Sequence, residues 1–130
     1  MKKTQNVLGL IAGAMLVLSS AAHSFLGWGE ISAALLSLHV SPDLMIGLAI
    51  AWHFGGAAML TLGCIVIWLF AQQRKGVAVS KVPAQLIGAM YLLFGAGALV
   101  ASNFDPFCLL FMIPGVLLAL AVYPVKQRSL

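Results

Sequence analysis

Apolar residues fill four long stretches of this chain, and short polar connections separate them. The stretches run from Val7 to about Trp28, from Pro42 to Phe70, from about Pro83 to Ala101, and from Pro106 to Tyr123. A helix that crosses a membrane needs about 17–25 mostly apolar residues, and each stretch is near that length, the second being longer. The pattern predicts an all-α integral membrane protein, residues 1–130 forming a single domain of four transmembrane helices in a bundle.

The first connection has a helical pattern of its own. Between Glu30 and His39 the apolar positions recur at intervals of three and four residues, at Ile31, Ala34, Leu35 and Leu38. This spacing places them on one face of a helix. We therefore expect a short helix here that lies in the membrane interface or caps the outer face of the bundle.

Two proline-containing turns predict where the second and fourth helices begin. Ser41 can cap a helix that opens at Pro42, and Asp43 complements the positive end of its dipole. Asp105 precedes Pro106 in the same way. Glycines within the first three stretches offer small surfaces for close helix contacts, among them Gly9, Gly13, Gly47, Gly55, Gly63 and Gly88.

The composition agrees with a membrane protein. Of 130 residues, 62% are hydrophobic and 8% are charged, and the mean hydropathy is +1.07. A soluble domain carries about 25% charged residues. The net charge of +4 therefore gives no indication of nucleic-acid binding, and the expected surroundings are a lipid bilayer, with other membrane subunits or further copies of the chain as partners.

The distribution of charge predicts the orientation. All Lys and Arg residues fall at the N-terminus, in the second connection or at the C-terminus, whereas the three acidic residues fall in the first or third connection. With four spans these two groups face opposite sides, and the positive-inside rule places both termini in the cytoplasm. We expect a multi-pass protein of a bacterial-type inner membrane.

The first stretch has an alternative interpretation. Lys2 and Lys3, an apolar run and the small residues Ser20-Ala21-Ala22 also resemble a secretory signal peptide with its cleavage site. Apolar character continues through Phe25, Leu26 and Trp28, which favours a retained span.

His53 is the main candidate for chemistry, because an ionisable residue inside a membrane span is costly and is a functional candidate by default. Counted along helices at 1.5 Å per residue, His53 lies about 25 Å from Phe70 and His23 about 24 Å from Val7, so both reach the outer part of the membrane. Three serines are expected near the same depth and complete a predicted outward-facing polar pocket: Ser19, Ser20 and Ser102.

Several functions fit this polar layer. The histidines can form ordinary interhelical hydrogen bonds, line a proton or substrate path, or act as axial ligands of haem b or another metal between helices. In helix count and in its pair His23 and His53 the chain is similar to b-type cytochrome bundles. No metal-binding, redox or phosphate-loop motif is present. The sequence thus predicts a non-enzymatic accessory or binding component, with a haem- or metal-binding electron-transfer module as the alternative.

Overall fold

The computed structural model describes residues 3–123, and its secondary structure in this range is entirely helical. Three long helices are α1 (Lys3–Ala21), α3 (Pro42–Arg74) and α4 (Val82–Ala101). A π-helix, η1 (Ala22–Gly27), joins α1 to α2 (Trp28–Ser37), and a 3-10 turn, η2 (Pro106–Cys108), leads into α5 (Leu109–Val122). These bounds agree closely with the four stretches predicted from the apolar pattern.

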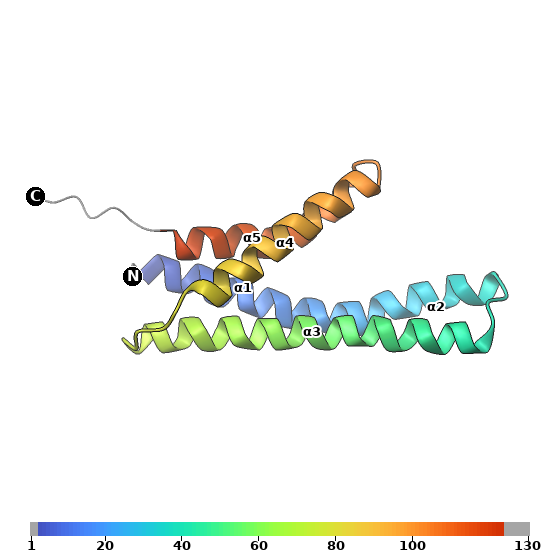
Figure 1. Ribbon diagram of the computed structural model, residues 1–130, viewed down its shortest axis with the longest axis horizontal. Helices are drawn as coiled ribbons and strands as arrows, with labels where there is room; N and C mark the ends of the chain where they lie inside the picture. The colour runs from blue at the N-terminus through green and yellow to red at the C-terminus, as the bar shows by residue number, and fades with distance from the viewer. Residues whose placement is uncertain (1–2, 124–130) are drawn as a thin grey trace, which may run out of the picture.

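The first connection differs from its prediction in one respect. Its residues are helical, as expected, but α2 continues directly from η1, so that Lys3–Ser37 forms one unbroken helical run. Gly27, which could have ended the first helix, has helical torsion angles (φ −63°, ψ −39°). The run lies antiparallel beside α3 along most of its length (Figure 1). Residues 30–39 therefore do not form a separate helix across the end of the bundle.

The predicted helix starts are present. The Ser41 side chain accepts a hydrogen bond from the Leu44 N–H at 3.4 Å, and Pro42 is the first residue of α3. The Asp105 carboxylate accepts one from the Phe107 N–H at 2.9 Å, directly before η2. Each cap satisfies a backbone donor that has no partner inside its own helix.

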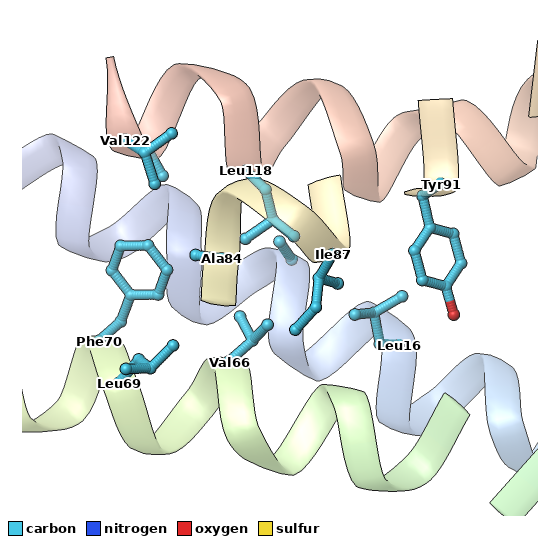
Figure 2. Close-up of a cluster of buried hydrophobic side chains, with 11 residues drawn as sticks. Leu16, Val66, Leu69, Phe70, Ala84, Ile87, Tyr91, Leu118 and Val122 are labelled. Atoms are coloured by element: carbon cyan, nitrogen blue, oxygen red, sulfur yellow. The ribbon is translucent and has the colours of Figure 1, made fainter. Parts of the chain in front are cut away.

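The hydrophobic core lies where the two helical hairpins meet. Leu16 from α1, Val66 and Phe70 from α3, and Leu118 from α5 are almost completely buried, and Ile87 and Tyr91 of α4 pack against them (Figure 2). At the end nearest the chain termini, the Gln5 side chain donates a hydrogen bond to the Tyr123 carbonyl at 2.7 Å. α1 is thus packed against both α3 and α5.

Glycines set the close approach of neighbouring helices. A Cβ atom on Gly63 would lie 2.8 Å from Val17 Cγ2 and 3.0 Å from the Gly13 carbonyl oxygen, so α1 and α3 touch through their backbones here. A Cβ on Gly88 would lie 3.1 Å from Leu118 Cβ, which places Gly88 in the α4–α5 contact. The helix-packing role predicted for these glycines is confirmed. The same role was predicted for Gly47 in α3, and there the prediction is wrong, because no neighbouring helix within residues 3–123 has an atom within 4 Å of its Cβ position.

The two hairpins diverge away from this core. α4 and α5 pack along each other, but their hairpin diverges from the first one, so that the α4–α5 turn lies apart from the α2–α3 turn (Figure 1). Within residues 3–123, no Cα atom of η1 or α2 lies within 8 Å of α4, η2 or α5. The half of the first hairpin that contains His23 and His53 is therefore not covered by the second hairpin.

Charge is segregated between the two ends of the molecule. Lys3 and the basic residues of the α3–α4 connection lie at the end where the chain enters, and the acidic residues lie at or near the two turns at the opposite end (Figure 1). The helical runs Lys3–Ser37, Pro42–Arg74 and Val82–Ala101 are each long and apolar enough to cross a membrane, and Pro106–Val122 is a shorter apolar helix. Lys2, Lys126 and Arg128 lie outside the described residues.

Candidate functional site

Two histidines and two tryptophans meet between the helices of the first hairpin. His23 and Trp28 belong to the η1–α2 segment, and Trp52 and His53 belong to α3. Each histidine contacts the tryptophan of the other helix. The His23 ring stacks on the Trp52 ring, with centroids 4.1 Å apart and an angle of 8° between the ring planes. The His53 ring lies 5.7 Å from that of Trp28, at 56°. We call these four residues the His–Trp cluster.

The π-helix has a direct role in the cluster. The indole Nε1–H of Trp52 donates a hydrogen bond of 2.7 Å to the backbone carbonyl of His23, which belongs to η1. A π turn departs from the regular α-helical hydrogen-bond ladder, and in apolar surroundings a carbonyl without a donor is costly. Trp52 therefore stabilises the irregular segment that brings His23 to face α3.

The His23 side chain in turn contacts the backbone of Trp52. Its Nε2 lies 3.2 Å from the Trp52 carbonyl oxygen. A carbonyl can only accept, so Nε2 is the nitrogen that carries the proton, and Nδ1 takes no part in this bond. A Cβ on Gly55 would lie 3.3 Å from His23 Nε2, and one on Gly27 would lie 3.0 Å from Trp52 Cζ2. These glycines leave the space in which the two rings stack.

His53 is placed differently. It is exposed on the side of the hairpin, and no hydrogen-bond partner for its ring is found among residues 3–123. Trp28, its neighbour, is half-buried. Its imidazole therefore remains available to a group outside the chain.

The serines proposed for the pocket lie in two separate places. Ser20 is buried beside the cluster and donates to the Val17 carbonyl at 2.7 Å, while Ser19 is half-buried one residue earlier. Ser102 follows α4, where its hydroxyl donates to the Leu99 carbonyl at 3.1 Å and accepts from the Asp105 N–H at 3.2 Å. Because the hairpins diverge, the structure brings Ser19 and Ser20 near His23 but leaves Ser102 in the α4–α5 turn.

Haem or metal binding by His23 and His53 stays a prediction, and the structure shows which groups His23 already contacts. Nε2 of His23 is engaged with the Trp52 carbonyl, and one face of its ring is covered by the indole. Among residues 3–123, no group of three or more His, Cys, Asp or Glu side chains is arranged to hold a metal ion. What the cluster offers is hydrogen bonding and aromatic contact.

The tryptophan partners were not predicted from the sequence. From the sequence, Trp28 was expected only as the end of the first apolar stretch, and Trp52 only as part of the second. His23 and Trp28 are five residues apart, a spacing that does not share a face in an α-helix, and the π turn changes this relation. Gly55 and Gly56 beside Trp52 were the available signal of a close contact at this level.

Comparisons with family models, curated proteins and solved structures found no match to this chain.

Proposed function

We propose that the protein is a non-enzymatic component of a bacterial-type inner membrane, with four spans and cytoplasmic termini, that holds a partner protein at the outer surface. The observation that carries this proposal is a difference in length between the hairpins. α3 has 33 residues and α4 has 20. These correspond to about 50 Å and about 30 Å of helix, against a hydrocarbon core of about 30 Å.

The longer hairpin is too long for the membrane alone. If the basic ends of both hairpins lie level at the cytoplasmic boundary, the first hairpin extends about 20 Å beyond the outer edge of the core. A tilt of about 40°, the upper end of the usual range, still leaves an excess of roughly 8 Å. We call the projecting part, α2 together with residues 42–50, the outer hairpin.

The outer hairpin carries an apolar surface. Leucine and isoleucine side chains that are more than half exposed occur on both of its helices and directly after α2: Leu36, Leu38, Leu44, Ile46 and Ile50. Exposed apolar side chains outside the membrane favour contact with another protein. The partner that fits it presents an apolar helical face, as a neighbouring membrane subunit does.

The His–Trp cluster supplies the polar part of the same surface. His53 lies at the base of the outer hairpin, exposed and without a hydrogen-bond partner among residues 3–123. An imidazole without a hydrogen-bond partner in the chain can donate to or accept from a polar group of a partner protein. Aromatic residues such as Trp28 are also typical centres of protein contacts.

The remaining polar side chains support a binding role over catalysis. His23 is bonded to Trp52, Ser20 to the Val17 carbonyl, and Ser102 to the Leu99 carbonyl, so each contributes to the fold. Ser102 Oγ also lies 3.3 Å from Cys108 Sγ, but neither group has a histidine or carboxylate side chain as a hydrogen-bond partner among residues 3–123.

Photo-crosslinking in intact membranes tests the proposal. A photoreactive phenylalanine at Ile50 is expected to give a discrete protein adduct, and the same residue at Leu93, exposed on α4, is expected to give none. The substitution His53→Ala should weaken the adduct at Ile50 without changing thermal stability. An adduct of twice the chain mass identifies a second copy as the partner. If Leu36, Leu38, Ile46 and Ile50 all fail to give an adduct, the proposal is wrong.

A further inference from the structure

A short groove lies between α4 and α5. Its volume is about 270 Å³. It is lined by Gln85, Gly88, Ala89, Leu92, Ala119, Val122 and Tyr123. Two residues of each helix in this lining, Gln85, Ala89, Ala119 and Tyr123, are exposed, whereas the neighbouring Ile87 and Leu118 belong to the buried core. The groove therefore opens to the surroundings of the molecule and not into the bundle.

Small residues form the floor of the groove. The backbones of α4 and α5 approach closely at Gly88 and Gly115, where a Cβ atom on Gly115 would lie 2.8 Å from the Gly88 carbonyl oxygen. Beside this contact, the side chains of Ala89 and Ala119 consist of one methyl group each. Two closely packed helices with so little side chain on their outer side leave a channel between them.

The groove has one polar end. Gln85 and Leu92 lie about 5 Å and about 15 Å along α4 from its start at Val82. The side chain of Gln85 is exposed, and its amide makes no hydrogen bond among residues 3–123. Tyr123, which is 68% exposed, directly follows α5. An unpaired amide and an aromatic ring thus lie at the end nearest the basic connection, and only apolar side chains line the rest.

The dimensions of the groove decide what it can hold. An α-helix with its side chains is about 10–12 Å across, and the groove follows α4 for only about 10 Å, so it is too short to seat a helix of a partner or of a second copy. Its volume is also below the range of about 300–1,000 Å³ that encloses a whole small molecule. An acyl chain is a single row of methylene groups, and part of its length fits.

We infer that the groove binds one acyl chain of a phospholipid from the cytoplasmic leaflet, with the ester region of the lipid at Gln85. At about 5 Å from the basic end of α4, Gln85 lies near the boundary of a hydrocarbon core about 30 Å thick. Its amide N–H can donate to an ester carbonyl oxygen, and tyrosine is typical of this level. The inference rests on the membrane placement in the proposed function, but not on the partner at the outer hairpin.

Native mass spectrometry of the full-length protein, purified in mild neutral detergent and titrated with dioleoyl phosphatidylethanolamine, tests this inference. Wild type is expected to retain one lipid per chain after the detergent is removed. Ala119→Phe fills the groove from an exposed position and should weaken lipid binding about tenfold, the loss expected when about two methylene groups stay unburied. The matched control is Ala96→Phe, exposed seven residues after Ala89 on the same face of α4 but outside the groove, which should leave binding unchanged.

Two further variants and two further probes separate the parts of the lipid. Ala89→Phe should repeat the loss, which keeps the test valid if Ala119→Phe fails to fold. Gln85→Leu should weaken binding about two- to tenfold, the contribution of one hydrogen bond, and unchanged binding would contradict the ester contact. Lysophosphatidylethanolamine, which has one chain, should bind wild type about as tightly as the two-chain lipid, whereas glycerophosphoethanolamine, which has none, should not bind.

Several outcomes overturn the inference. They are equal losses in Ala119→Phe and Ala96→Phe, a lysolipid that does not bind, and a second copy of the chain retained in place of lipid and lost in Ala119→Phe. Protein that stays in the membrane fraction of cells but retains no lipid contradicts the acyl-chain site and leaves the proposed function intact. Protein that is absent from the membrane fraction contradicts both.

Discussion

At the scale of single residues, Trp52 makes the most specific connection between the two long helices. Its indole donates to the His23 carbonyl and its own carbonyl lies beside His23 Nε2, so each residue both gives and receives a polar contact. The stacked rings add aromatic contact at the same place. The segment around His23 is a π-helix, which makes this connection important for local stability.

Trp52→Phe tests that connection, because it keeps an aromatic ring and removes the N–H donor. We expect a loss of about 0.6 kcal/mol and at most about 2 kcal/mol in the free energy of unfolding, the range of interhelical hydrogen bonds in membranes. Denaturant unfolding in detergent micelles measures it. The control is Trp68→Phe, an exposed position on the same helix, with an expected change within about 0.5 kcal/mol. Equal stability of the two variants would show that the indole bond contributes nothing.

The histidines also predict an absorption spectrum. Because His23 Nε2 is bonded to the Trp52 carbonyl and the ring is covered by the indole, we expect purified protein to show no Soret band, even after haem is supplied. A Soret band that disappears in both His23→Ala and His53→Ala, but persists in His39→Ala, would contradict this geometry. It would restore the electron-transfer alternative indicated by the sequence.

At the scale of helices, the apolar pattern and the two proline turns were sufficient to predict α3, α4 and α5. Ser41 and Asp105 cap where expected because their side chains are the nearest acceptors for free N–H groups. The continuity of α1, η1 and α2 could not be predicted. The first span was predicted to end at about Trp28, but Gly27 has helical torsion angles and the helical run continues through it. The π turn left no recognisable pattern in the sequence.

Substitution of glycine by alanine is expected to have opposite effects at two positions of α3. Gly63→Ala should destabilise the protein by about 1–3 kcal/mol, because the new methyl group meets the backbone of α1 at 2.9 to 3.0 Å, and backbone cannot rotate away. Gly47→Ala should stabilise it by up to about 1 kcal/mol through helix propensity, since that position has no neighbour within 4 Å. The thermal unfolding midpoints of both variants and of wild type, measured in the same detergent, test these two predictions. A stabilising Gly63→Ala would mean that α1 and α3 are further apart than described.

At the scale of the whole molecule, the divergence of the hairpins explains why only part of the polar layer was predicted. Counting residues along helices gives height, and it correctly indicated that His23 and His53 lie near one level. The position of a residue along its helix does not show the angle between the two hairpins. The large buried side chains that join them, Leu16, Phe70 and Leu118, all lie toward one end. No comparable contacts join the hairpins at the end that contains the turns, within residues 3–123. Ser102, in the α4–α5 turn, therefore lies apart from the histidines.

The packing of α1 is relevant to whether the first segment is a retained span or a cleaved signal peptide. α1 is the helix that contacts both α3 and α5, and Ala12 and Leu16 are completely buried in the shared core. Cleavage after Ala22 would remove the helix that connects the two hairpins and expose apolar surface on both. Retention of the first segment as a span remains a prediction, and N-terminal sequencing of the mature protein tests it, since an N-terminus at His23 would contradict it.

Orientation in the membrane is the last prediction, and it follows from where the turns and charges lie. The α2–α3 turn and the α3–α4 connection are at opposite ends of the molecule, and the connection holds Arg74, Lys75 and Lys81 (Figure 1). The positive-inside rule then places the connection in the cytoplasm. A reporter enzyme active only in the periplasm should be active when fused after Ser37 and inactive when fused after Lys75. A reporter active only in the cytoplasm should give the reverse pattern, and protein levels of the fusions provide the control. Activity of the periplasmic reporter after Lys75 would show that the orientation of the molecule is the reverse of the predicted one.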